Sequence, residues 1–127
     1  MNTKQNKYGW VGVDLDRTLA FYENKMSRSP TFIGEPIPKT VALVKRLLEQ
    51  GTTVKVFTAR VSNRKKVTPL VRYLTRLAIE DWCKEHLGAV LEVTCEKDED
   101  MVALIDDRAV GIHMNTGEIS DTRPLWF

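Results

Sequence analysis

Residues 8–18, YGWVGVDLDRT, decide the fold, because an apolar run leads there directly into two aspartates. Residues 8–15 are rich in aromatic and β-branched residues and nearly unbroken in their apolar character, which is typical of a strand buried on both faces. Side chains two residues apart on a strand point to the same side, so we expect Asp14 and Asp16 on one side and Leu15 in the core. The sequence therefore predicts a buried first strand that ends in two carboxylates.

Segments with helical and strand patterns alternate after this strand. Apolar residues fall on one helical face over residues 39–50, and Gly51 follows where a helix commonly ends. Thr68 and Pro69 are typical first residues of a second helix, which runs to about residue 87 before Gly88. Its apolar stripe consists of Leu70, Leu74, Leu77 and Ala78. Further strands are predicted at residues 52–58, 89–95 and 102–105, with a terminal hairpin over 109–120.

This alternation predicts an α/β, Rossmann-like fold in three layers, with a central, mostly parallel sheet and helices on both faces. A length of 127 residues fits a single domain, so we interpret residues 1–127 as one unit. Residues 19–38 hold three prolines and no sustained period, which predicts a loop or small flap.

Composition indicates a soluble globular protein, since 43% of residues are hydrophobic and 28% charged. Cys83 and Cys95 form no CxxC motif, and no secretory or membrane-spanning stretch is present, so we expect a cytoplasmic protein without a membrane partner. Residues 1–76 carry 15 Lys and Arg against 5 Asp and Glu, whereas residues 77–127 carry 4 against 12. This asymmetry fits either an anionic partner or two solvated faces that meet in the fold.

Chemically reactive side chains follow the predicted strands. The carboxyl ends of parallel strands meet at one edge, where ligands bind in open sheets. Four carboxylates crowded there repel one another unless they are protonated, paired with lysine or bound to a cation, and oxygen ligands with open positions suit Mg²⁺. A carboxylate beside Mg²⁺ can attack phosphorus to form an aspartyl-phosphate while a neighbouring carboxylate moves protons. The residues at these strand ends are Asp14, Asp16, Thr58, Ala59, Arg60, Lys97, Asp106 and Asp107.

The motifs DLDRT, VFTAR, a later lysine and IDD, in this order, resemble those of the haloacid dehalogenase (HAD) superfamily, in its small capless phosphatase form. The resemblance implies that Asp14 is the nucleophile and a Mg²⁺ ligand. Asp16 would be the general acid and base and would offer its backbone carbonyl to the metal. Thr58 would hold a phosphoryl oxygen, and Asp106 with Asp107 would complete the metal site. An aspartate at position 16 favours phosphomonoester hydrolysis over dehalogenation, because an ester leaving group needs a proton.

Two positions depart from the family pattern. Arg17 stands where many phosphatases of the family have glycine, so either the turn differs or Arg17 touches substrate beside Thr58, Ala59 and Arg60. Lys97 follows the third strand, as the family's lysine does, but it precedes Asp106 by only nine residues. We predict Lys97 as the catalytic lysine, with Lys65 and Lys66 as the alternative.

The gaps between these motifs leave no room for a cap domain. An open site fits a large substrate, such as a nucleic-acid end or a phosphoprotein, or an oligomer partner that covers it; a phosphorylated small molecule such as a nucleotide is the other substrate class. Two other functions stay open: a receiver-like signalling domain and a catalytically silent phosphate-binding module. A receiver places its acidic pair after the first strand, the reverse of the order found here.

Overall fold

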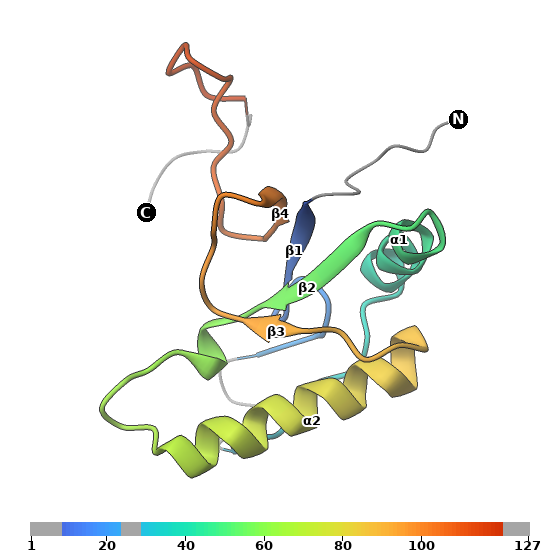
Figure 1. The fold of residues 1–127 in the computed structure, drawn as a ribbon, viewed down its shortest axis with the longest axis vertical. Helices are drawn as coiled ribbons and strands as arrows, with labels where there is room; N and C mark the ends of the chain where they lie inside the picture. The colour runs from blue at the N-terminus through green and yellow to red at the C-terminus, as the bar shows by residue number, and fades with distance from the viewer. Residues whose placement is uncertain (1–8, 24–28, 121–127) are drawn as a thin grey trace.

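Strand β1 (Trp10–Asp14) lies inside a four-stranded parallel sheet of order β3-β2-β1-β4 (Figure 1). The computed structural model describes residues 9–23 and 29–120. The other strands are β2 (Thr53–Phe57), β3 (Val93–Thr94) and β4 (Met101–Ile105). The predicted α/β class with a parallel, open sheet is therefore confirmed.

Two α-helices connect the strands: α1 (Pro38–Glu49) and α2 (Pro69–Leu87), with a short 3₁₀ helix, η1 (Ala59–Val61), after β2. Helix α2 begins as predicted, because the Thr68 hydroxyl accepts the N–H of Val71 and Pro69 occupies the first turn. It ends at Gly88, whose φ of 79° is the left-handed conformation that glycine adopts without a steric penalty.

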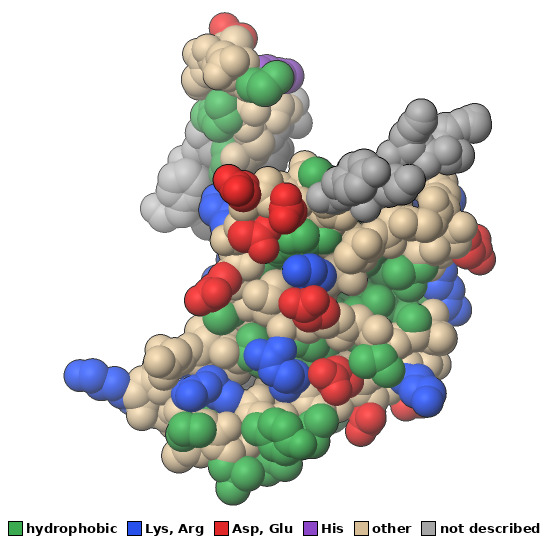
Figure 2. All heavy atoms as spheres, in the orientation of Figure 1, with side chains coloured by type: hydrophobic (Ala, Val, Ile, Leu, Met, Phe, Trp, Pro, Cys, Tyr) green, Lys and Arg blue, Asp and Glu red, His purple; other side chains and the backbone are tan. Residues whose placement is uncertain are grey.

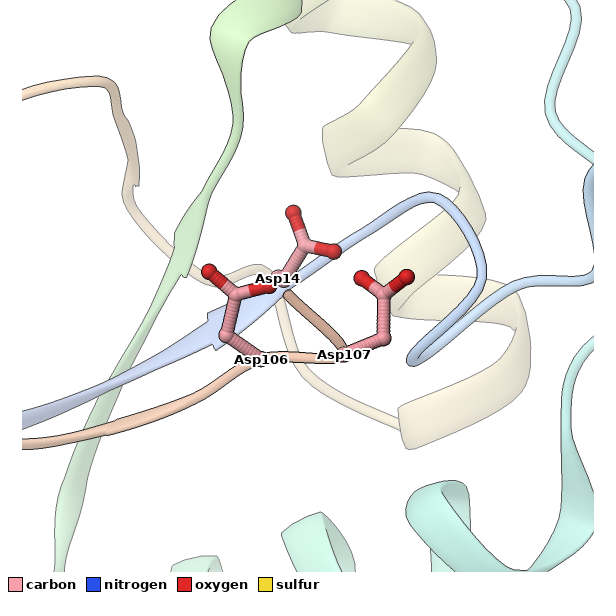
Figure 3. Close-up of side chains that lie close together, drawn as sticks. All are labelled: Asp14, Asp106 and Asp107. Carbon is pink, nitrogen blue, oxygen red and sulfur yellow. The ribbon is translucent and has the colours of Figure 1, made fainter. Parts of the chain in front are cut away.

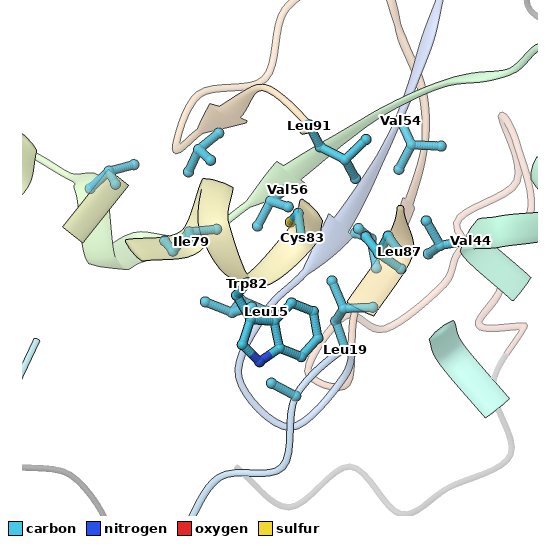
Figure 4. Packing of buried hydrophobic residues seen from close by; sticks show 14 residues of the cluster. Leu15, Leu19, Val44, Val54, Val56, Ile79, Trp82, Cys83, Leu87 and Leu91 are labelled. Atoms are coloured by element: carbon cyan, nitrogen blue, oxygen red, sulfur yellow. The ribbon is translucent and has the colours of Figure 1, made fainter. Parts of the chain in front are cut away.

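Both α-helices pack on the same face of the sheet. Strands β1, β2 and β3 lie side by side in chain order, and right-handed crossovers then place α1 and α2 on one side. One core forms between them, and Figure 4 shows its packing. It joins Val13, Leu15, Val54, Val56 and Val93 of the sheet and the loop after β1 to Val44 of α1 and Ile79, Trp82, Cys83 and Leu87 of α2.

The prediction of helices on both faces is wrong for the described residues. The connection from β3 to β4 spans only residues 95–100, which is too short for a crossover helix. On this second face the Trp10 ring lies against Gly12, where an added Cβ would come within 3.2 Å of it. The Lys55 ammonium sits 4.5 Å from the centre of that ring, and Asp98 accepts its indole N–H.

The apolar stripe of α2 also lies differently from what an amphipathic pattern leads one to expect. Leu70, Leu74 and Leu77 are exposed, and the buried face is formed instead by Thr75, Ile79, Trp82, Cys83 and Leu87. Trp82 closes this core toward the predicted flap, because its indole N–H donates to the Gly34 carbonyl at 2.9 Å.

The flap and the terminal hairpin are less regular than the sheet. Within residues 19–38, the described part contains no helix before α1, and Ala20 bridges to Pro36; residues 24–28 lie outside the described residues. The predicted hairpin over 109–120 has one antiparallel bridge, Ile112 to Ile119, and projects away from the sheet in Figure 1. None of the helices in the described part is long and apolar enough to cross a membrane.

Candidate active site

Three carboxylates converge at the carboxyl ends of β1 and β4. The register pairs Val13 with Ile105, so the next residues, Asp14 and Asp106, leave the sheet side by side, and Asp107 follows. Each offers one oxygen, and these three oxygens lie within 4.8 Å of one another (Figure 3). This convergence agrees with the predicted metal ligands Asp14, Asp106 and Asp107.

Asp14 is the most perturbed member of this acidic cluster. Burial raises its pKa to about 7, and the hydrogen bond with Asp107 and the charge of Asp106 act in the same direction. The Thr18 hydroxyl partly opposes this by lying 3.2 Å from Asp14 Oδ2, and it also lies 3.3 Å from Asp107 Oδ1. Burial is the largest cause of this shift, and the neighbouring negative charges add to it. A divalent cation with oxygen ligands would offset these charges and therefore fits the cluster.

The Asp16 side chain lies apart from that cluster. Arg60 donates two hydrogen bonds to its carboxylate, from Nε to Oδ2 at 2.9 Å and from Nη2 to Oδ1 at 2.8 Å. Arg60 also donates from Nη1 to the carbonyls of Pro30 and Phe32 in the flap. The Asp16 carboxylate is therefore not one of the three that converge, and the predicted metal contact of Asp16 stays confined to its backbone carbonyl.

Thr58 brings a buried hydroxyl to the cleft floor. It is 2% exposed, follows the last residue of β2, and caps η1 by accepting the N–H of Arg60 at 3.2 Å. Since β2 neighbours β1, the end of β2 places Thr58, Ala59 and Arg60 beside the aspartates.

Arg17 occupies the turn directly after the two aspartates. Its φ of 72° is left-handed, a conformation that costs a non-glycine residue on the order of 1 kcal/mol. Its guanidinium carbon lies 5.0 Å from the centre of the Tyr22 ring, within cation–π range. The turn thus keeps the glycine-like backbone although an arginine stands there, and its side chain faces the cleft.

One cleft of about 650 Å³ unites these residues. Tyr22, Arg64 and Arg108 also line the cleft, although they were not among the predicted site residues. Thr18 was also not among the predicted site residues. Its position in the DLDRT motif is the sequence feature that could have indicated its contacts with Asp14 and Asp107. The predicted site residues that line the cleft are Asp14, Asp16, Arg17, Thr58, Ala59, Arg60, Asp106 and Asp107.

Lys97 is the predicted catalytic residue that the structure does not bring to the cleft. It is exposed on the connection between β3 and β4 and is not among the residues that line the cleft. Its neighbour Asp98 binds Trp10 at the start of β1, whereas Asp14 is at the end. Because β3 and β4 are parallel and only residues 95–100 join them, this short connection runs from the carboxyl end of β3 back to the amino end of β4 and carries Lys97 away from the cleft. Lys65 and Lys66 are exposed in the loop before α2, beside the cleft-lining Arg64 and Val67.

The chain is similar in structure to a conserved protein encoded by a locus of Bacteroides thetaiotaomicron. The TM-score is 0.51 with 23% sequence identity, over 83% of this chain and 81% of that one. No protein-family profile and no curated protein sequence matches the chain. The structural likeness supports the fold alone, so a function has to be argued from the cleft.

Proposed function

We propose that this protein is a Mg²⁺-dependent phosphatase that hydrolyses a phosphomonoester through an aspartyl-phosphate. The observation that carries the proposal is the convergence of Asp14, Asp106 and Asp107 at the mouth of a cleft that also holds Asp16 and Thr58. Mg²⁺ held by the three converging carboxylates would supply positive charge for the phosphoryl oxygens.

The chain's own residues divide the reaction between them. An oxygen of Asp14 attacks phosphorus, the ester P–O bond breaks, and the leaving oxygen takes a proton from the Asp16 carboxyl group. Water then attacks the phosphorus of the acyl phosphate while Asp16 accepts its proton, which releases inorganic phosphate and restores Asp14. The Thr58 hydroxyl and backbone N–H groups at the end of β2 donate to the phosphoryl oxygens.

The Asp16–Arg60 pair must loosen for this chemistry. Both Asp16 oxygens accept hydrogen bonds from Arg60, and a carboxylate used in this way cannot also protonate a leaving group. A substrate phosphate is a competing bidentate partner for the guanidinium. Substrate binding would therefore free one Asp16 oxygen and leave Arg60 on the phosphate.

Arginines on the cleft wall favour a substrate with more than one anionic group. Arg17, Arg64 and Arg108 all line the cleft in addition to Arg60. This supports a nucleotide or a nucleic-acid end over a phosphate ester whose remaining part is neutral. For such a substrate kcat/KM should fall steeply with salt, while that for an aryl phosphate should change little.

A catalytically silent phosphate-binding module is the second candidate. The position of Lys97 away from the cleft and the engagement of Asp16 by Arg60 favour it over turnover. The two functions differ in product: an enzyme releases phosphate with repeated turnover, whereas a binding module only retains the ligand.

Hydrolysis of an aryl phosphate with and without Mg²⁺ tests the proposal. We expect turnover with Mg²⁺, loss of turnover in EDTA, and recovery when Mg²⁺ is added in excess. An Asp14→Asn chain purified identically reports the background from contaminating phosphatases. Turnover that persists in EDTA would refute the metal assignment, and a rate no greater than the Asp14→Asn background would favour the binding module.

A further inference from the structure

An exposed apolar stripe runs along the first half of α2. Its residues stand at positions i, i+3, i+4 and i+7, which lie above one another on a helix. The side chains are 65%, 57%, 44% and 37% exposed for Leu70, Tyr73, Leu74 and Leu77 respectively. They lie opposite the face of α2 that packs on the core, and none of them belongs to the hydrophobic core cluster of the described residues.

Opposite charges flank the two ends of this stripe. Arg64, Lys65 and Lys66 are exposed just before α2, and Asp81 and Glu85 are exposed on the stripe's own line one and two turns after Leu77. Lys84 stands beside these two acids. Figure 2 shows the same order along this side of the molecule, with basic side chains at one end, hydrophobic ones over the first half of α2 and acidic ones beyond.

We propose that this stripe is the interface of a homodimer in which two α2 helices pack antiparallel. A two-fold axis between Tyr73 and Leu74 sets Leu70 of one copy against Leu77 of the other. Along the two helices, residue numbers that face each other then sum to 147. The basic turn that precedes α2 of one copy, which contains Lys66, therefore comes near Asp81 of the other copy. A parallel pairing in register would set basic against basic and acidic against acidic, which opposes association.

The interface is small and borders the cleft. A standard interface buries about 800 Å² per partner, and four side chains with a charged rim supply less, so we expect a dissociation constant on the order of micromolar. Arg64 and Val67 line the cleft, and Leu70 begins the stripe only three residues later. A second copy would therefore lie next to the cleft mouth without contributing to the acidic cluster.

Sedimentation equilibrium on the full chain, from low to high micromolar concentration, tests the dimer. We expect the mass to rise from 14.5 kDa toward twice that value. Leu74→Glu should keep the chain monomeric without lowering the melting temperature, because the side chain is exposed. Val90→Glu is the matched control, since Val90 is 57% exposed but lies beyond α2, and it should still dimerise.

A charge exchange tests the antiparallel register. Lys66→Glu and Asp81→Lys should each weaken the dimer several-fold, and the double variant should recover it, because the opposing pair is restored with its signs reversed. A chain that is monomeric at every concentration, or dimerisation unaffected by Leu74→Glu, would overturn the proposal. Failure of the double variant to recover would overturn the antiparallel arrangement.

Discussion

The two aspartates of DLD, Asp14 and Asp16, occupy opposite surroundings although one residue separates them. Asp14 lies among Asp106 and Asp107, and its pKa rises to about 7. Asp16 has each oxygen bonded to the Arg60 guanidinium instead. The acidic half of the cleft, with Asp14, Asp106 and Asp107, thus carries negative charge that a bound cation could offset. In the other, neutralised half, the charge of Asp16 is balanced by Arg60 of the same chain. Under the proposed function, the surroundings of Asp14 and Asp16 rather than their residue type would give them different roles.

The largest effect should come from the acidic half. Asp14→Asn removes the proposed nucleophile, so we expect kcat to fall by at least about 10³-fold with every phosphate ester. The neutral amide relieves repulsion from Asp106 and Asp107, so the melting temperature in EDTA should not fall. Phosphate release and thermal unfolding measure the two effects. The control is Asp100→Asn, an exposed acid outside the cleft, and a variant at position 14 that keeps most activity would show that Asp14 is not the nucleophile.

Asp16→Asn should give a smaller loss that depends on the leaving group. General acid catalysis contributes roughly 10²–10⁴-fold, and its value is greatest for a poor leaving group. We therefore expect a large decrease with an alkyl phosphate and a much smaller one with a nitrophenyl phosphate. Comparing kcat for the two esters separates proton donation from simple damage to the site, which would lower both equally.

Arg60→Lys tests the neutralised half. A lysine cannot make the two parallel bonds that the guanidinium makes to Asp16, nor reach the flap carbonyls at the same time. We expect about a tenfold decrease in kcat/KM, mainly through KM, with a lower melting temperature. Arg46→Lys in α1 lies outside the cleft and serves as the control. Unchanged kinetics would mean that Arg60 does not contact substrate.

The sequence predicted the elements that depend on local signals. The caps of α2 follow from Thr68, Pro69 and Gly88, and the ends of β1, β2 and β4 follow from apolar runs that stop at Asp14, Thr58 and Asp106. The cleft residues were predictable because parallel strands end at one edge. These predictions share a dependence on residues that are close in the chain.

The rest depended on packing between distant residues. The predicted stripe of Leu70, Leu74 and Leu77 is exposed, whereas the face with Thr75 and Cys83 is buried. That face packs in the core with residues distant in the chain, and its Trp82 donates to the Gly34 carbonyl of the flap. The hydrogen bonds between Arg60 and Asp16 join residues 44 positions apart in the chain, and no local sequence pattern predicts them. Helices on both faces were predicted from the general alternation of helices and strands. The strands predicted at 89–95 and 102–105 already left no room between them for a crossover helix, so the sequence itself argued against a helix on the second face.

The pH dependence of stability tests the surroundings of Asp14 and should show a smaller effect than the kinetic variants. Burial raises the pKa of Asp14 from its ordinary value of 3.8 to about 7 in the folded chain, so between these two pH values the folded state holds a proton that the unfolded state lacks. Its contribution to stability is fully present below about pH 4 and is lost as pH rises to 7. In EDTA, the melting temperature of Asp14→Asn relative to the unmodified chain should therefore increase from pH 5 to pH 7. A constant difference would contradict the raised pKa.

The smallest effect is expected at Lys97, where family order and geometry disagree. The order of motifs that resembles the HAD superfamily predicted Lys97 as the charge-balancing lysine, and loss of such a lysine would cost about 10²–10³ in rate. The structure instead places it on an exposed connection, next to Asp98 at the Trp10 end of β1. An exposed lysine outside the cleft changes binding by well under about 1 kcal/mol, so Lys97→Ala should leave kcat and KM unchanged. Arg64→Ala, which removes a cation that lines the cleft, should raise KM and is the informative companion. An inactive Lys97→Ala together with a normal Arg64→Ala would contradict this placement. It would mean that the connection from β3 to β4 moves during turnover and brings Lys97 to Asp14.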